Sequence, residues 1–404
     1  MREPYVERRV NTPLLDNDLI KVILGPRRAG KSCFAIHWLS SLGSFGYANF
    51  DDERLLDLAN YDELIAAMDS VYGKPKHLLL DEIQNVPRWE LLVNRLQRQG
   101  YRLVLTGSNA HLLSKELATH LTGRHTPIVI FPFSFSEYLQ AKGAQLTEPE
   151  QADALRRYLE EGGFPEPLVK PMDRPSYLTA LWDSVIYKDI VKRHRIRAVH
   201  GMDDLGRYLL SNVASGYSST TLSQVTKCQS SHTVEKYLGY LEEAFLFFSM
   251  KRFSFKAREQ SRANRKIYCM DNGFVTSRGF HFSANTGKLC ESAVAVALKK
   301  QELNRQAEVY FWKSPQQEEV DFVVKRGPEI EALIQVCWEL RAPTTKERQV
   351  RGLLKASRDL RCGNLLVLTA DLESEEDMEW FGTKERVRFL PLRKWLSAAE
   401  SQIA

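Results

Sequence analysis

The sequence has no long hydrophobic run and no closely spaced cysteine pair, and each absence excludes a class of protein. No stretch approaches the roughly 20 apolar residues that a membrane-spanning helix needs, and residues 1–10 lack the apolar core of a signal peptide. We therefore expect no membrane contact. The six cysteines are Cys33, Cys228, Cys269, Cys290, Cys337 and Cys362. Because none forms a Cys-x-x-Cys pair, we expect reduced thiols in the cytoplasm and neither a zinc site nor a disulfide framework.

The chain also lacks a strong excess of charge. A net charge of +5 is too small to name a partner, so the distribution of the charges matters more. Hydrophobic residues make up 43% and charged residues 26%, which is ordinary for a folded protein and argues against long disorder. A length of 404 residues suits two or three domains.

One eight-residue motif carries the most specific chemistry. It matches the pattern G-x-x-x-x-G-K-[ST] and consists of Gly25, Pro26, Arg27, Arg28, Ala29, Gly30, Lys31 and Ser32. Residues 19–24 predict a buried strand before it and residues 33–39 a helix after it. Such a loop delivers phosphates to the amides of a helix N-terminus. We expect an ATP site in which Lys31 reaches the β- and γ-phosphates and Ser32 binds Mg²⁺.

Polar residues follow two later predicted strands at their carboxyl ends. Residues 77–80 lead into Asp81 and Glu82, where Asp81 would hold Mg²⁺ and Glu82 would orient and deprotonate the attacking water. A solvated turn is the alternative. Residues 102–107 lead into Ser108 and Asn109. Either would contact the γ-phosphate or the water, although ordinary turn chemistry explains them equally well.

Short apolar runs that alternate with helical patterns predict an α/β domain with a parallel sheet over residues 1–145. Arg124 precedes its fifth strand, residues 126–131. The motifs, their order and the segment FPFSFSEY resemble the prokaryotic AAA+-like ATPases that carry an uncharacterised C-terminal domain. The resemblance implies that Arg124 is a finger entering a neighbour's active site, and hence a homo-oligomeric ring. A locally paired surface arginine is the alternative, and Arg27 and Arg28 could also serve phosphates.

The middle of the chain predicts a helical lid or linker over residues 146–200, with a break at residues 162–167, and then a winged helix over residues 201–280. Three helical patterns precede two strand-like runs, residues 246–252 and 266–270. The cations on and between these runs are Lys251, Arg252, Lys256, Arg258, Arg262, Arg265 and Lys266. They favour binding to DNA phosphates, whereas a protein-interaction module is the alternative. Phe253 and Phe255 are candidates for base stacking or for the core.

Residues 281–404 show an α-β-β-β-α-β order that resembles the PD-(D/E)XK nuclease fold. The resemblance places Glu291, Asp321 and Gln335 at the positions that bind a divalent cation. The lysine of the motif is replaced by Cys337, and Lys325 on the neighbouring predicted strand could substitute for it. A degenerate fold used for binding or structure, an active nuclease and a chance pattern are the three interpretations, and we expect nuclease activity to be absent.

Together these features predict a Mg²⁺-dependent ATP hydrolase that couples ATP to binding or remodelling of DNA, branched or single-stranded, in genome maintenance or defence. One alternative is a STAND-like nucleotide switch that binds a protein partner. Another is a metal-dependent nuclease gated by ATP.

Overall fold

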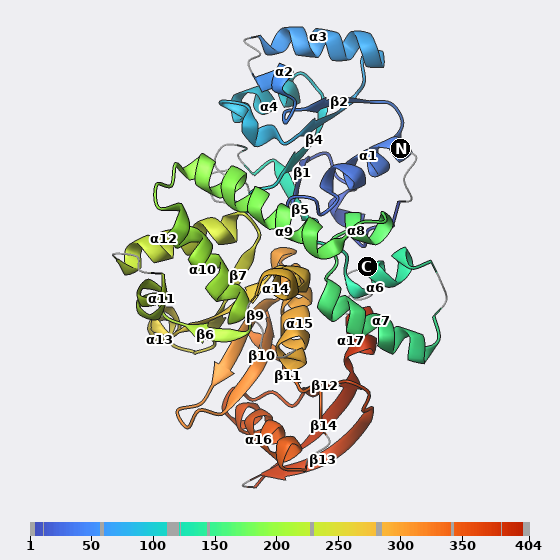
Figure 1. The fold of residues 1–404 in the computed structure, drawn as a ribbon. Coiled ribbons are helices and arrows are strands. Elements are labelled where there is room, and N and C mark those ends of the chain that lie inside the picture. Colours follow the sequence, from blue (N-terminus) through green and yellow to red (C-terminus); the bar gives the residue numbers. More distant parts are fainter. Residues whose placement is uncertain are drawn as a thin grey trace. The chain divides into compact units, whose positions relative to one another are not determined.

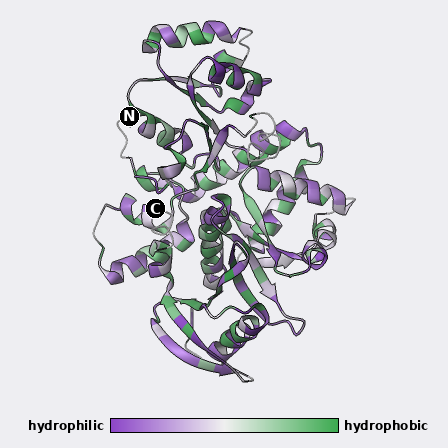
Figure 2. Cartoon of the chain, turned by 180° about the vertical axis from the view of Figure 1, so that it is seen from behind, coloured by the Kyte–Doolittle hydropathy of each residue, from purple (hydrophilic) through white to green (hydrophobic). Residues whose placement is uncertain are grey.

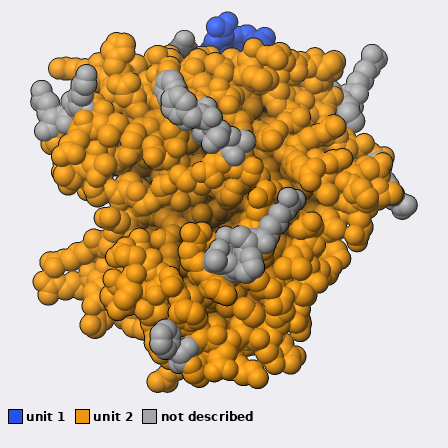
Figure 3. All heavy atoms as spheres, turned by 60° about the horizontal axis from the view of Figure 1, so that its bottom comes forward, with its two compact units in different colours: residues 1–132, 243–245, 404 blue, residues 133–242, 246–403 orange. Residues whose placement is uncertain are grey.

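The computed structural model describes residues 5–10, 12–56, 60–110, 121, 123–143, 146–226, 230–279, 285–340, 343–380 and 382–398. The chain divides into two units (Figures 1 and 3). Unit 1 comprises residues 1–132, 243–245 and 404, and unit 2 comprises residues 133–242 and 246–403. Cys228, and Thr122 of the predicted finger segment, lie outside the described residues.

The centre of unit 1 is a five-stranded sheet in the order β2-β3-β4-β1-β5, parallel throughout. The strands are β1 (Ile20–Leu24), β2 (Phe45–Asn49), β3 (His77–Asp81), β4 (Arg102–Gly107) and β5 (His125–Val129). Every residue of β1 is buried, as expected of a strand covered on both faces. The predicted α/β parallel sheet is therefore confirmed, and β4 lies between β1 and β3.

Helices fix the loop of the eight-residue motif to this sheet. They are α1 (Lys31–Leu42), α2 (Glu53–Leu56), α3 (Tyr61–Tyr72) and α4 (Trp89–Arg98), with short 3₁₀ turns at Thr12–Leu14 and Ile83–Asn85. On α1, Phe34, Ala35 and Leu39 pack in one apolar cluster with residues of β1, β3, β4 and β5. Because α1 is packed along its length, the loop before it is held at the carboxyl edge of the sheet.

Unit 2 begins with helices around a glycine pair. The helices are α6 (Phe135–Ala141), α7 (Glu148–Glu161), α8 (Glu166–Val169) and α9 (Arg174–Ser184), which continues as the π-helical segment η4 (Val185–Lys192). A Cβ on Gly163 would lie 2.1 Å from the Phe133 carbonyl oxygen, and one on Gly162 would lie 1.9 Å from Asp271 Oδ1. The sequence break at these glycines is thus a site of close packing within unit 2.

Three helices and three antiparallel strands follow. The helices are α10 (Val199–Ser211), α11 (Ser219–Val225) and α12 (Ser231–Glu243), and the strands are β6 (Ser215–Tyr217), β7 (Phe247–Arg252) and β8 (Arg265–Cys269). The three helical patterns and both strand-like runs of the sequence are present. A short helix, α13 (Ala257–Arg262), connects β7 to β8 and was not predicted.

The rest of unit 2 contains the predicted α-β-β-β-α-β order and an additional hairpin. Its elements are α14 (Asn272–Arg278), α15 (Thr286–Leu303), β9 (Glu308–Lys313), β10 (Glu319–Arg326), β11 (Glu329–Val336), α16 (Pro343–Leu360), β12 (Leu365–Thr369), β13 (Ser374–Trp380), β14 (Thr383–Pro391) and α17 (Leu392–Ala398). The outer strand β13 is largely exposed and hydrophilic (Figure 2).

One mixed sheet of nine strands runs through unit 2, in the order β13-β14-β12-β11-β10-β9-β7-β8-β6. β7 pairs in parallel with β9, where Lys251 lies opposite Tyr310 and Arg252 opposite Phe311. The predicted boundary between residues 280 and 281 therefore falls between segments that share one sheet. Among the described residues, no helix is long and apolar enough to cross a membrane.

Candidate functional site

The loop between β1 and α1 adopts a conformation that depends on its glycines. Gly25 has φ +145°, and a Cβ there would lie 1.9 Å from the Ile130 carbonyl oxygen. Gly30 has φ 93° and occupies the N-cap of α1, where no side chain caps the helix. Ala29 is buried, and its amide donates to the Pro26 carbonyl at 3.2 Å. The first turn of α1 therefore presents backbone amides that can donate hydrogen bonds to an anion.

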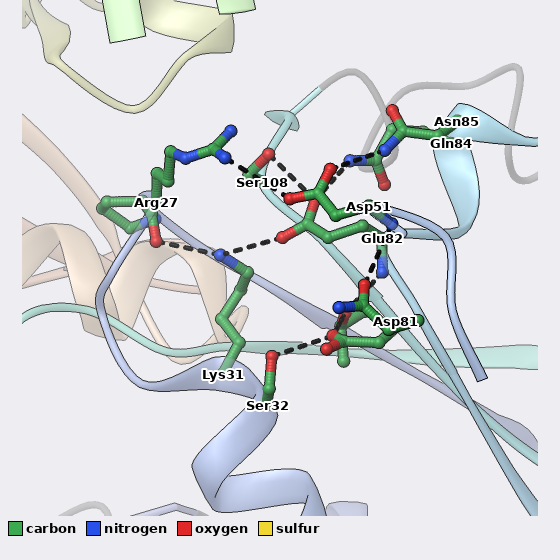
Figure 4. A network of polar contacts seen from close by, with 12 residues as sticks. Arg27, Lys31, Ser32, Asp51, Asp81, Glu82, Gln84, Asn85 and Ser108 are labelled. Carbon is green, nitrogen blue, oxygen red and sulfur yellow. Dashed lines mark hydrogen bonds and ion pairs between the residues drawn. The ribbon is translucent and has the colours of Figure 1, made fainter. Parts of the chain in front are cut away.

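Lys31 lies inside this loop and is buried, with 4% of its surface exposed. Its ammonium donates to the Pro26 carbonyl at 2.9 Å and lies 3.9 Å from Glu82 Oε1 (Figure 4). The Lys31 ammonium thus connects the loop, through Pro26, to Glu82 at the carboxyl end of β3.

Asp81 and Ser32 form a pair of oxygen groups beside the loop. Ser32 Oγ donates to Asp81 Oδ1 at 2.8 Å, and the Tyr47 hydroxyl donates to Asp81 Oδ2 at 3.1 Å. Thr106 also donates to Asp81. Burial, and then the charge of Asp81, raise the pKa of Tyr47, so its hydroxyl stays protonated. A hydroxyl and a carboxylate side by side suit Mg²⁺, which prefers oxygen ligands.

Glu82 follows β3 in the left-handed region, with φ 52°. A side chain there costs about 1–3 kcal/mol, which indicates that the surroundings dictate this conformation. The Glu82 amide donates to Thr106 Oγ1 at 3.0 Å, and Glu82 Oε2 accepts hydrogen bonds from Gln84 and, at 3.1 Å, from Ser108 Oγ. The carboxylate is therefore oriented by groups from β4 and from the turn after β3.

The pKa of Glu82 lies below its ordinary value. Burial alone would raise this pKa, but the Lys31 charge and the hydrogen bonds from Gln84 and Ser108 outweigh it. Glu82 is therefore ionised near neutral pH although it is half-buried. An ionised, oriented carboxylate next to a phosphate-binding loop can accept a proton from water.

The two arginines of the loop and Asn109 are arranged differently. Arg27 pairs with Asp51 at 3.3 Å, and Asp51 also accepts a hydrogen bond from Asn85 at 2.9 Å. Arg28 has φ 65°. Asn109 is buried directly after Ser108, the residue that contacts Glu82.

Arg124 lies apart from these residues. It stands at the beginning of β5, where its carbonyl accepts the Ile20 amide at 3.1 Å, at the start of β1. In a parallel sheet this is the edge opposite to the loop, separated from it by the length of β1, on the order of 15 Å. The exposed Arg124 side chain makes no hydrogen bond or ion pair within the described residues. Arg124 is thus too far from the loop of its own chain to act there.

Sequence reasoning missed Tyr47 and Thr106, both of which donate to Asp81. Thr106 lies within the predicted strand before Ser108, and Tyr47 lies on β2, two residues from its end. Only the alignment of β2, β3 and β4 in one parallel sheet brings them to Asp81. No motif in the sequence marks them.

Three of the seven cations predicted for DNA, Arg252, Arg258 and Arg262, line one cavity of unit 2. The cavity has a volume of about 570 Å³ and its lining includes Arg252, Phe255, Arg258, Arg262 and Lys313. Lys251, Lys256 and Arg265 are on β7, next to α13 and on β8, respectively. Lys256 pairs with Glu259 at 3.0 Å. Phe255 is 76% exposed, whereas Phe253 is buried in the core of the C-terminal sheet.

Lys266 does not line this cavity, and the prediction that it contacts DNA is wrong. It is only 4% exposed because its side chain points into unit 2. Its ammonium lies 2.8 Å from Glu291 Oε1 and 3.4 Å from Asp321 Oδ1. An ion-paired, buried ammonium cannot reach a phosphate backbone.

The three residues predicted to bind a second metal do come close together. Gln335 Nε2 donates to Asp321 Oδ2 at 2.8 Å, and Lys266 bridges Asp321 to Glu291. Among the described residues, no group of three or more histidine, cysteine, aspartate or glutamate side chains has the geometry of a metal site. Lys325 pairs with Glu308 at 2.6 Å, so the substitution of Lys325 for the missing lysine is not supported.

Comparisons with known proteins divide the chain into three parts. Residues 17–139 match an AAA domain, residues 152–280 match the domain of unknown function DUF8612, and residues 286–395 match the domain of unknown function DUF4143. Among solved structures, a Walker-type ATPase of Pyrococcus abyssi is 16% identical with a TM-score of 0.43, covering 65% of this chain and 91% of that one. RuvB of Thermotoga maritima is 15% identical with a TM-score of 0.29, covering 59% and 84%. Neither likeness is close enough to say more about this chain.

Two uncharacterised proteins are similar over most of their length. One, from Methanocaldococcus jannaschii, is 32% identical over 409 residues, which cover 96% of this chain and 90% of that protein. The other, from Haemophilus influenzae, is 32% identical over 358 residues, with coverages of 84% and 87%. The chain therefore belongs to the family of these proteins, AAA-type P-loop ATPases in which the AAA domain is followed by the DUF8612 and DUF4143 domains.

Proposed function

We propose that unit 1 hydrolyses ATP with Mg²⁺ and that hydrolysis is coupled to DNA bound by unit 2. The observation that carries the first half is the convergence of Lys31, Ser32, Asp81, Glu82 and Ser108 at one edge of the sheet. The family match to an AAA P-loop ATPase supports ATP and Mg²⁺ as the ligands.

Each residue of this convergence has a distinct role. The loop amides and the Lys31 ammonium bind the phosphates, and Ser32 and Asp81 hold Mg²⁺, which neutralises charge on the transferred phosphoryl group. Glu82 accepts the proton of the attacking water, and Ser108 fixes the carboxylate oxygen that it contacts. Asn109 is the second candidate for contact with the γ-phosphate.

Because Glu82 lies beside Lys31, we expect the pKa of Glu82 to depend on whether nucleotide is bound. The Lys31 charge is one of the causes that hold the pKa of Glu82 low in the free protein. Bound phosphates compete for that charge, so the pKa of Glu82 rises and the carboxylate becomes a better proton acceptor. ATP binding thereby activates Glu82, the base that takes the proton of the attacking water.

Arg124 serves the active site of a neighbouring copy. Its position at the amino edge of the sheet rules out a role at its own loop, and its side chain is exposed and has no partner within the described part of the chain. A cation supplied by a second chain stabilises charge on the transferring phosphoryl group. This role requires a homo-oligomer, which we propose is a ring.

DNA binding is assigned to a winged helix, residues 201–280, and in particular to the cavity next to α13. Arg258 and Arg262 line this cavity and make no side-chain hydrogen bond or ion pair within the described residues. Clustered, unpaired arginines gain affinity by displacing counterions from phosphates. The exposed ring of Phe255 beside them offers a face on which an unpaired base can stack, which favours single-stranded or branched DNA over duplex.

The coupling is tested by ATP turnover with duplex, single-stranded, forked and four-way DNA. We expect single-stranded or branched DNA to stimulate turnover most. Arg258→Gln with Arg262→Gln should abolish the stimulation and lower the slope of log affinity against log salt by about 0.7 for each phosphate that is no longer neutralised. Arg388→Gln is the matched control, because Arg388 is an exposed arginine on β14.

A different result would favour a different function. If no DNA stimulates turnover and a pull-down yields one stoichiometric protein, the chain is a nucleotide switch of the STAND-like kind. If turnover responds to DNA equally in the wild type and in the double arginine variant, DNA binds elsewhere.

A further inference from the structure

Lys266 of β8 is surrounded by three carboxylates from later parts of the chain. Its ammonium lies 2.8 Å from Glu291 on α15, 2.5 Å from Glu319 and 3.4 Å from Asp321, both on β10. The Lys266 side chain is only 5% exposed. A single interior cation therefore neutralises acidic groups from two elements.

The remaining donors around this cluster hold the carboxylates in place. Asp321 Oδ2 accepts hydrogen bonds from Gln335 Nε2 at 2.8 Å and from the Val336 amide at 2.9 Å. The Tyr268 hydroxyl, two residues along β8 from Lys266, donates to Glu291 Oε1 at 2.7 Å. Asp321 and Glu291 are thus oriented with an oxygen of each toward the same point, and the ammonium occupies that point.

The surroundings keep Lys266 charged. Burial would lower its pKa, but its electrostatic interactions with Tyr268, Glu291, Asp321 and Glu319 raise the pKa well above its ordinary value. Removal of one partner from such a buried cluster leaves uncompensated charge, which is strongly destabilising. Three carboxylates within 3.4 Å thus compensate the charge of the ammonium inside this site.

We infer that the Lys266 ammonium is a built-in cation that fills the position of a divalent metal in a nuclease-like site, so that this site holds no metal and does not cut DNA. Oxygens around a divalent cation lie about 2.0–2.6 Å from it, so a metal bound by Glu291 and Asp321 would need the space that the ammonium fills. The two cations exclude each other.

The same contacts hold β8 to other elements of unit 2. Lys266 ties β8 to α15 and β10, and β7 beside it pairs with β9. The cluster therefore connects the proposed DNA-binding segment to the nuclease-like segment through charge as well as through the backbone. The role of the cluster is structural: the ammonium, in the position that a metal would take, holds β8, α15 and β10 together.

The test is titration with Mn²⁺, followed by paramagnetic resonance, of the full chain without nucleotide. An Asp81→Asn background removes the metal-binding carboxylate of the loop in every sample. With Lys266 intact we expect no Mn²⁺ whose binding depends on Asp321. Lys266→Ala should gain about one bound Mn²⁺ per chain and a higher melting temperature with Mn²⁺, and both gains should vanish when Asp321→Asn is added.

Two outcomes would overturn the inference. One is Mn²⁺ bound by the chain with Lys266 intact and released in Asp321→Asn, which would make Lys266 a neighbour of a metal. The other is a folded Lys266→Ala chain, verified by circular dichroism, that gains no Mn²⁺. If Lys266→Ala does not fold, Lys266→Gln replaces it, and the chain with Lys266 intact still decides the first outcome.

Discussion

Glu82 is a half-buried and Asp271 a buried carboxyl group, and their neighbours shift their pKa in opposite directions. Around Glu82 the positive charge of Lys31 and two side-chain donors overcome burial. Around Asp271 burial dominates, because its close donors are the amides of Gly163 and Gly273, and its pKa rises to about 7. Glu82 is therefore suited to accept a proton, whereas Asp271 fixes the glycine pair and the start of α14.

Asp271 should make the stability of unit 2 depend on pH. Its pKa in the folded chain, about 7, exceeds its ordinary value of 3.8, so between these values the folded chain keeps a proton that the unfolded chain has released. Stability from this group is thus greatest at low pH, falls as the pH rises to about 7 and is constant above. When the pH rises from about 5 to about 8, the melting temperature of the wild type should fall by more than that of Asp271→Asn. Equal losses would show that Asp271 does not titrate in this range.

At the scale of elements, strands with polar residues at their carboxyl ends were the easiest to predict. Apolar residues before Asp81 and before Ser108 mark β3 and β4, and the parallel sheet then brings both ends to the loop. The elements that escaped prediction have weaker patterns. The helix α13 has no buried residue, and β13 alternates between exposed and half-buried positions with five polar residues in seven.

Lys266 shows why a sequence cannot assign a charged residue to a surface. It lies among cations in the sequence, and its partners Glu291 and Asp321 follow 25 and 55 positions later. The sheet that joins β8 to β10 through β7 and β9 brings Asp321 to Lys266, and the helix α15 brings Glu291. The apolar residues after Lys266 predicted the strand correctly, but they do not reveal what the buried lysine contacts.

At the scale of the whole molecule, the role proposed for Arg124 requires a second chain. If active sites are shared, Arg124→Ala should lose turnover while still binding ATP, and Lys31→Ala should lose binding. Random assembly of equal amounts of the two variants pairs an intact loop with an intact finger in about a quarter of the sites, so about a quarter of wild-type turnover should return. A mixture as inactive as its components would instead assign Arg124 a local role.

The central claim is that the β1–α1 loop of unit 1 binds ATP with Mg²⁺ and that Glu82 is the general base for its hydrolysis by water. Calorimetric titration of ATP with Mg²⁺, paired with turnover in the same samples, tests this claim most directly. The wild type and Glu82→Gln should bind ATP and Lys31→Ala should not, while turnover of Glu82→Gln should fall by about 10²–10⁴-fold. A wild type that takes up no ATP, or a Glu82→Gln chain that turns it over at the wild-type rate, would contradict the claim.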